Sequence, residues 1–168
     1  PYRRQRQMCI RDRSSSGKIQ RGILENGKIG SITTRSDVQS IGRLYAGGIA
    51  GRDDKQTQES EDAFRYESSI TQCQIMNTSV GSAYTAGGII GENNFSVISE
   101  NTMDGVSVYG GCEYAGHIAG IWRSTCCVAK DNYIANARTA TDTGTADIAA
   151  GYAEKPDVYD GVHATVMV

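Results

Sequence analysis

A glycine-rich segment of five residues recurs along the chain and decides the fold. Its four copies are Gly47-Gly48-Ile49-Ala50-Gly51, Gly87-Gly88-Ile89-Ile90-Gly91, Gly116-His117-Ile118-Ala119-Gly120 and the degenerate Ala146-Asp147-Ile148-Ala149-Ala150. The interval between the first two copies is longer than the two intervals that follow, which are nearly equal. Self-similarity at a period of about 30 residues is typical of proteins that stack one short structural unit on the next.

The composition indicates that the stacked unit is made of strands. The 168 residues include 16 Ile, 10 Val and 13 Thr but only two Leu. β-Branched side chains suit a pleated surface, whereas Leu favours helices. No apolar run approaches the roughly 18 residues of a membrane span. The 17 basic and 19 acidic residues nearly balance, which argues against a nucleic-acid binder held by phosphate contacts.

We therefore predict an all-β chain that forms a parallel β-solenoid (β-helix) fragment of three to four coils. Each coil would complete its backbone hydrogen bonds by stacking on the next coil at a spacing of about 4.8 Å. Glycines are expected where the chain turns tightly or two backbones approach. The structural repeat residues are Gly47, Gly48, Ile49, Gly51, Gly87, Gly88, Ile89, Gly91, Gly116, Ile118, Gly120 and Ile148. The same alignment predicts that Asn101 and Asn132 stack as an inward amide ladder, with Cys73 as the apolar substitute in that column.

The chain is expected to have three parts. Residues 3–13 resemble the in-frame translation of a DNA sequencing adapter, so residues 1–13 are expected to be a disordered artefact that replaces the true N-terminus of a fragment assembled from shotgun reads. Residues 14–154 are expected to form the solenoid repeats, with a charged excursion at 52–68. Residues 155–168 are expected to be a closing strand or the start of another module. Without the adapter-like segment, which holds five Arg and one Asp, the chain is more acidic.

The five-residue segments resemble GLUG-motif repeats, in which two glycines precede a branched apolar residue, a small or apolar residue and another glycine. Such repeats occur in large bacterial surface proteins, including the region upstream of the catalytic domain in immunoglobulin A-specific metallopeptidases. The resemblance covers about residues 28–154, and His117 departs from the pattern, as do Ala146, Asp147 and Ala150. It implies a non-enzymatic repeat module of a bacterial cell-surface or secreted protein, a spacer or adhesin that presents its coil turns.

The sequence holds no familiar motif for catalysis, cofactor binding or metal binding. It contains no His-Glu-x-x-His, no Gly-x-Ser-x-Gly and no phosphate-binding loop with lysine, and its cysteines lack the spacing of a zinc site. We therefore expect no catalytic residue, no cofactor and no metal. The alternative function is a polysaccharide-processing β-helix enzyme, a lyase or hydrolase, which requires acid and base groups that converge on one face.

Two sets of polar residues allow more than one interpretation. Glu100 and Asp131 occupy one repeat column, and stacking would make them either a weak calcium site or two solvated turn residues; we prefer the second interpretation. The cysteines are expected to be free and mostly buried, and a Cys112–Cys126 disulfide is the alternative in a secreted protein.

One aromatic pair is a candidate ligand face. Trp122 lies four residues after Ile118, and Tyr152 lies four residues after Ile148, so stacking would place both rings on one edge of adjacent coils. An exposed aromatic pair suits a sugar or a partner protein, whereas a buried pair would cover the end of the core, which we prefer. The expected partners are a host glycan or surface protein and further repeats of the same chain, without nucleic acid or membrane insertion.

Overall fold

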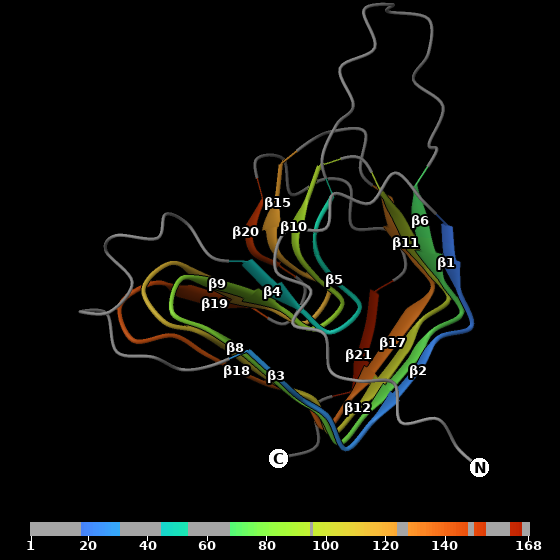
Figure 1. The fold of residues 1–168 in the computed structure, drawn as a ribbon, viewed down its shortest axis with the longest axis horizontal. Coiled ribbons are helices and arrows are strands. Elements are labelled where there is room, and N and C mark those ends of the chain that lie inside the picture. The colour runs from blue at the N-terminus through green and yellow to red at the C-terminus, as the bar shows by residue number, and fades with distance from the viewer. Residues whose placement is uncertain are drawn as a thin grey trace, which may run out of the picture.

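The computed structural model describes residues 18–30, 45–53, 68–94, 96–123, 128–147, 150–153 and 162–165, and every regular element in these ranges is a β-strand. The strands form five parallel sheets (Figure 1). Sheet 1 contains β1 (Lys18–Gln20), β6 (Ser69–Thr71), β11 (Val97–Ser99) and β16 (Val128–Lys130). Sheet 2 contains β2 (Ile23–Glu25), β7 (Gln74–Met76), β12 (Thr102–Asp104), β17 (Asn132–Ala135) and β21 (Val162–Thr165).

The other three sheets have four strands each. Sheet 3 contains β3 (Lys28–Ile29), β8 (Ser79–Ser82), β13 (Ser107–Gly110) and β18 (Arg138–Ala140). Sheet 4 contains β4 (Tyr45–Gly47), β9 (Thr85–Gly87), β14 (Tyr114–Gly116) and β19 (Thr145–Asp147). Sheet 5 contains β5 (Ala50–Arg52), β10 (Ile90–Asn93), β15 (Ala119–Trp122) and β20 (Ala150–Ala153).

The strands stack in register. From β1 to β15, each strand pairs in parallel with the strand five places later, so that Ile70 lies beside Ile98 and Ile98 lies beside Ala129. A run of five strands, such as β6–β10, is therefore one coil. In Figure 1 sheets 2 and 3 form the two arms of a V, and sheet 4 lies alongside sheet 3 inside it. This architecture confirms the prediction of an all-β chain of stacked parallel strands and is consistent with a β-solenoid.

The core consists of apolar side chains that stack in rows from coil to coil. Because successive side chains of a strand point to opposite faces, each strand of sheets 1, 2 and 3 contributes its middle residue or residues to the interior. The inward rows are Ile70, Ile98 and Ala129 in sheet 1, Ile75, Met103 and Ile134 in sheet 2, and Val80 and Val108 in sheet 3. Removal of these side chains from water is the main force that holds the coils together.

The chain turns the corner between sheets 1 and 2 on one residue in the left-handed conformation. In successive coils this residue is Arg21, Gln72, Glu100 or Asp131, with φ between 53° and 58°. The corner between sheets 2 and 3 uses Asn26, Asn77, Gly105 and Asn136. Asn and Gly adopt positive φ at the lowest cost, which explains their recurrence at the second corner.

A ladder of buried amides joins the coils beside the first corner. Asn101 Nδ2 donates to Asn132 Oδ1 at 2.9 Å and to the carbonyl oxygen of Ile70 at 2.9 Å. Asn132 Nδ2 donates to the carbonyl oxygen of Ile98 at 2.8 Å, and the backbone N–H of Cys73 donates to Asn101 Oδ1 at 2.9 Å. The three side chains of this column are at most 1% exposed. The predicted amide ladder is therefore confirmed, with Cys73 at the position where it stops.

The glycine pairs form the turn from sheet 4 to sheet 5. A Cβ atom on Gly87 would lie 2.5 Å from the carbonyl carbon of Ile90 and 2.8 Å from the backbone nitrogen of Gly120. A Cβ atom on Gly88 would lie 3.1 Å from both Cα and the carbonyl carbon of His117 in the next coil. The first glycine is therefore needed inside the turn, and the second where the turn of the next coil lies against it.

The fourth copy of the segment was predicted one residue out of register. Gly116 pairs with Asp147, and Ala119 pairs with Ala150, so this coil contains one residue more than the interval from Ile118 to Ile148. Ile148 itself lies outside the described residues. The residue equivalent to Gly120 is Gly151, where a Cβ atom would lie 2.6 Å from a neighbouring backbone nitrogen.

The start of the predicted charged excursion belongs to the folded coil. Asp53 is 2% exposed, and its Oδ2 accepts hydrogen bonds from the backbone N–H of Ser96 at 2.8 Å and from Ser96 Oγ at 2.6 Å. Its other oxygen accepts from the backbone N–H of Asn94. Asp53 thus holds the turn that follows β10, and only residues 54–67 of the predicted excursion lie outside the described residues.

The predicted terminal parts fall mostly outside the described residues. Residues 1–17, which include the adapter-like segment, lie outside the described residues. Near the other end, β21 extends sheet 2 by pairing with β17. Within the described ranges, no helix has the length and apolar character needed to cross a membrane.

His117 occupies a glycine position of the repeat and is fully buried. Its Nε2 atom lies 2.9 Å from the carbonyl oxygen of Val106, whereas the described part of the chain offers no hydrogen-bond partner to Nδ1. Burial lowers the pKa of His117, because the charged imidazolium would be removed from water. In the unfolded chain this histidine gains a proton near its ordinary pKa. In the folded protein it stays neutral to a lower pH.

Acid is expected to destabilise the protein partly through His117. As the pH falls below the unfolded-state pKa of about 6.5, the unfolded chain binds a proton that the folded chain excludes, so the free energy of unfolding decreases. His117→Gln keeps a donor for the Val106 carbonyl and cannot titrate. Urea unfolding at pH 7.5 and pH 5.0 should show a smaller loss of stability for this variant than for the parent. An equal loss in both proteins would contradict a buried neutral His117.

Candidate functional site

Of the predicted aromatic pair, Trp122 is buried, and the side chain of Tyr152 lies outside the described part of the structure. Trp122 is 1% exposed and lies beside Ala153, whereas Tyr152 lies beside Ile121. The extra residue in the fourth repeat therefore offsets the two aromatic residues along adjacent strands. Trp122 is a core residue, which agrees with the preferred interpretation and not with the alternative that it faces a sugar.

The predicted acid column is a corner column on the outside of the stack. Glu100 Oε2 accepts a hydrogen bond from Gln72 Nε2 at 2.8 Å, and Gln72 Oε1 accepts one from Arg21 Nε at 3.2 Å. The carboxylate of Glu100 is thus engaged with an amide of the neighbouring coil, which agrees with a turn residue more than with a calcium ligand.

The two cysteines in the described ranges are free thiols. Cys73 is buried, and Cys112 is partly exposed. Burial raises the pKa of Cys73, which keeps it protonated and unreactive. Because Cys112 is free, the structure does not show the alternative of a Cys112–Cys126 disulfide, and Cys126 itself lies outside the described residues.

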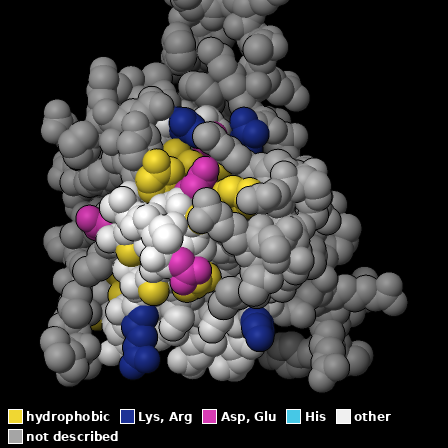
Figure 2. All heavy atoms as spheres, turned by 90° about the vertical axis from the view of Figure 1, so that its left-hand side faces the viewer, with side chains coloured by type: hydrophobic (Ala, Val, Ile, Leu, Met, Phe, Trp, Pro, Cys, Tyr) yellow, Lys and Arg dark blue, Asp and Glu magenta, His cyan; other side chains and the backbone are white. Residues whose placement is uncertain are grey.

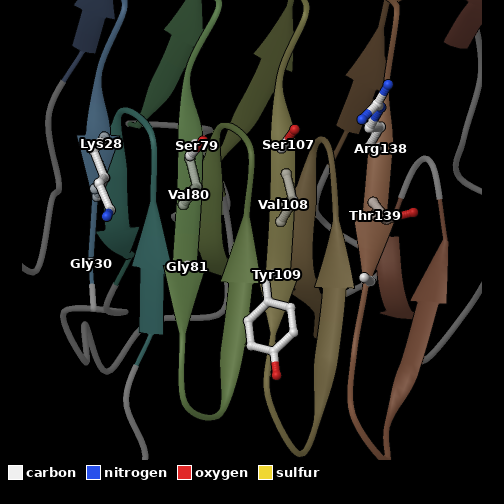
Figure 3. Close-up of a pocket in the computed structure, with 12 residues that line it drawn as sticks. Lys28, Gly30, Ser79, Val80, Gly81, Ser107, Val108, Tyr109, Arg138 and Thr139 are labelled. Atoms are coloured by element: carbon white, nitrogen blue, oxygen red, sulfur yellow. The ribbon is translucent and has the colours of Figure 1, made fainter. Parts of the chain in front are cut away.

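A shallow groove lies over the four strands of sheet 3 and is the best candidate for a ligand-binding site. Its volume is about 270 Å³ (Figure 3). The outward residues of the first position in each strand form one row across the sheet: Lys28, Ser79, Ser107 and Arg138. Figure 3 shows Lys28 and Arg138 at opposite ends of this row, with the two serines between them.

A second row places one aromatic ring beside the polar row. Tyr109 lies between Gly81 on β8 and Ala140 on β18, neither of which has a side chain large enough to cover it. Interaction with the Asp142 side chain, with some desolvation, raises the pKa of the Tyr109 hydroxyl. Figure 3 shows the ring beside the polar row, at the Tyr109 position of β13.

The groove carries positive charge on a chain that is acidic overall. Lys28 and Arg138 are both exposed, and the chain has a formal charge of −2. Figure 2 shows the end of the molecule at sheets 3 and 4, with basic side chains at both its lower and its upper parts and acidic side chains between them. The attraction that the groove offers to an anionic ligand therefore rests on the two exposed cations Lys28 and Arg138.

A second polar cluster lies at the end of sheet 5. Glu92 is 3% exposed and lies between two arginines of neighbouring coils, with Oε1 3.1 Å from Arg123 Nε and Oε2 3.9 Å from Arg52 Nε. The Arg52 guanidinium also lies 5.7 Å from the ring centre of Tyr45. Burial alone lowers the pKa of Arg123, but hydrogen bonds and charges of Glu92 and Tyr45 outweigh it and raise the pKa. The cluster is an ion-pair network that links residues of three neighbouring coils.

Sequence reasoning missed both clusters, because neither has a local motif. Lys28, Ser79, Ser107 and Arg138 come from four different coils and are separated by long and unequal stretches of sequence. Only the correct register, with the strand alternation of each coil, would have brought them together. Comparison with protein-family models, with curated proteins and with solved structures gives no match.

Proposed function

We propose that the chain is a non-enzymatic repeat module of three to four coils across residues 28–154, which acts as a spacer and adhesin of a bacterial cell-surface or secreted protein. The observation that carries this proposal is the outer face of sheet 3, where residues of four coils align as a basic, hydroxyl-bearing and aromatic surface. The resemblance to GLUG-motif repeats supports the same function.

The proposed mechanism is geometric. Stacked coils with a continuous apolar core make a stiff body, because each strand is fixed by its neighbours above and below. A stiff body holds the groove at a set distance from the surface that bears it. Its ligand is a host glycan or a surface protein, and further repeats of the same chain would extend the stack.

Tyr109→Ala tests this function against a matched control. Labelled protein is applied to a glycan array, and the expected result is binding without release of shorter sugars into solution. Tyr109→Ala should lower the signal about tenfold, because it removes the aromatic platform. Tyr133→Ala should leave it unchanged, since Tyr133 is 46% exposed on sheet 2, away from the groove. Equal loss in both variants would contradict a role for sheet 3.

The second candidate function is a polysaccharide-processing β-helix enzyme. The observation in its favour is the convergence of Glu92 with Arg52, Arg123 and Tyr45, because acid and base groups meet there. Its weakness is that the Glu92 carboxylate is buried and ion-paired with both arginines, which disfavours proton transfer by Glu92. Turnover of a polysaccharide that is abolished by Glu92→Gln would favour the enzyme over the adhesin.

A further inference from the structure

The stacking of the coils fixes the distance between the two basic residues at the ends of the groove. Lys28 and Arg138 lie on the first and last strands of sheet 3, three strand spacings or about 14 Å apart. Between them lie only the hydroxyl side chains of Ser79 and Ser107 in the same row. A ligand that meets both cations must therefore be extended, must follow the stacking axis and must carry negative charge at more than one point.

The ring of Tyr109 identifies the chemistry between the charges. An aromatic face packs against the C–H bonds of a sugar ring, while the surrounding sugar hydroxyls bond to polar side chains. Gly81 places no side chain beside the partly exposed ring on the neighbouring strand. Ser79 and Ser107 supply hydroxyl groups that both donate and accept. Charge, hydroxyls and one stacked ring together fit a charged glycan.

An acidic peptide fits this surface less well. Peptides that add to a sheet do so at an edge, where backbone N–H and C=O groups are available. The inner strands β8 and β13 already pair on both sides, so their backbone groups are used within the sheet. The face can therefore bind only through side chains, which is the manner in which a glycan is recognised.

We propose that the groove of sheet 3 binds an acidic glycan that lies along the stacking axis, with carboxylate groups of two sugars at Lys28 and Arg138 and an intervening sugar on Tyr109. This inference rests on the proposed adhesin function and adds the ligand class and its direction. Ion pairs with the two cations supply selectivity for the charged glycan, and the aromatic contact supplies the part of the affinity that does not depend on charge.

The test uses two forms of one polymer. The full chain is titrated with polygalacturonate and with the same polymer after full methyl esterification, which removes the charge and keeps the sugars. Binding to the acidic form should be at least about tenfold tighter and should weaken with added salt. Arg138→Ser, which introduces the serine found at the same position of the inner strands β8 and β13, should weaken this binding about tenfold. Lys130→Ser makes the same charge change at an exposed position of sheet 1 and should have no effect.

The outcomes separate this inference from the proposed function. One outcome is that both polymers bind equally well, that Tyr109→Ala weakens this binding and that Arg138→Ser does not. This outcome would overturn the inference that the ligand is acidic, but it would leave the proposed adhesin function standing. Equal effects of Arg138→Ser and Lys130→Ser, or equally tight binding of duplex DNA, would overturn it in favour of unspecific attraction between charges. Failure to bind either polymer, together with a blank glycan array, would overturn both.

Discussion

Gly87→Ala is expected to destabilise the protein by more than about 3 kcal/mol, because overpacking of backbone against backbone leaves no flexible side chain to move aside. The added Cβ atom would lie 2.5 Å from the carbonyl carbon of Ile90 and 2.8 Å from the backbone nitrogen of Gly120. Ile90 lies on β10 of the same coil, and Gly120 lies on β15 of the next coil. Thermal and urea unfolding would measure the loss, and a failure to recover folded protein would be its extreme form.

Gly22→Ala is the matched control for this substitution. A Cβ atom on Gly22 would meet only Cys73 Sγ, at an ordinary contact distance of 3.5 Å. Its effect should stay within about 1 kcal/mol, and a reduced entropy of the unfolded chain can make it slightly stabilising. Equal stability of the Gly87→Ala and Gly22→Ala proteins would contradict the tight turn between sheets 4 and 5.

Asn101→Ala is expected to cost about 3 kcal/mol, because it leaves several buried polar groups without partners at about 1–3 kcal/mol each. The groups that lose a bond are the backbone N–H of Cys73, the carbonyl oxygen of Ile70 and Oδ1 of Asn132. Asn132 Oδ1 keeps its bond from the backbone N–H of Asn101 at 3.1 Å, which limits the loss at that atom. Urea unfolding at neutral pH measures the difference.

Gln74→Ala provides the comparison for the amide ladder. Gln74 lies one residue beyond Cys73, on the exposed side of β7, so its removal should change stability by no more than about 0.5 kcal/mol. If Asn101→Ala proved as mild as Gln74→Ala, the asparagines would not be stacked inside the coils.

The sequence allowed the repeating features of the fold to be predicted, because the same physical requirement returns in each coil. The glycine pairs mark the same turn, and Asn101 and Asn132 share one buried column. The fourth copy was aligned on Ile148, which lies outside the described residues, and the strands on either side of it pair one residue out of that alignment. Pairing of Ala119 with Ala150 decides that register, and a single short motif carries too little information to do so.

The features that could not be predicted depend on contacts between coils. Asp53 and Glu92 look like surface charges in the sequence, yet each is at most 3% exposed. Asp53 is buried because Ser96 of the next coil satisfies its oxygens, and Glu92 because an arginine lies on either side. The groove of sheet 3 is unpredictable for the same reason, since an outward row such as Lys28 to Arg138 exists only after stacking.

The central claim is that stacking brings Lys28 and Arg138, which are distant in the sequence, onto one face of one sheet. Pulsed electron paramagnetic resonance between spin labels at these two positions tests it most directly. Labels attached through unnatural amino acids avoid the five cysteines. The stacked coils should give one narrow distribution of label-to-label distances, which corresponds to backbones about 14 Å apart. A broad distribution beyond about 30 Å, as in an unfolded segment between the two positions, would contradict it.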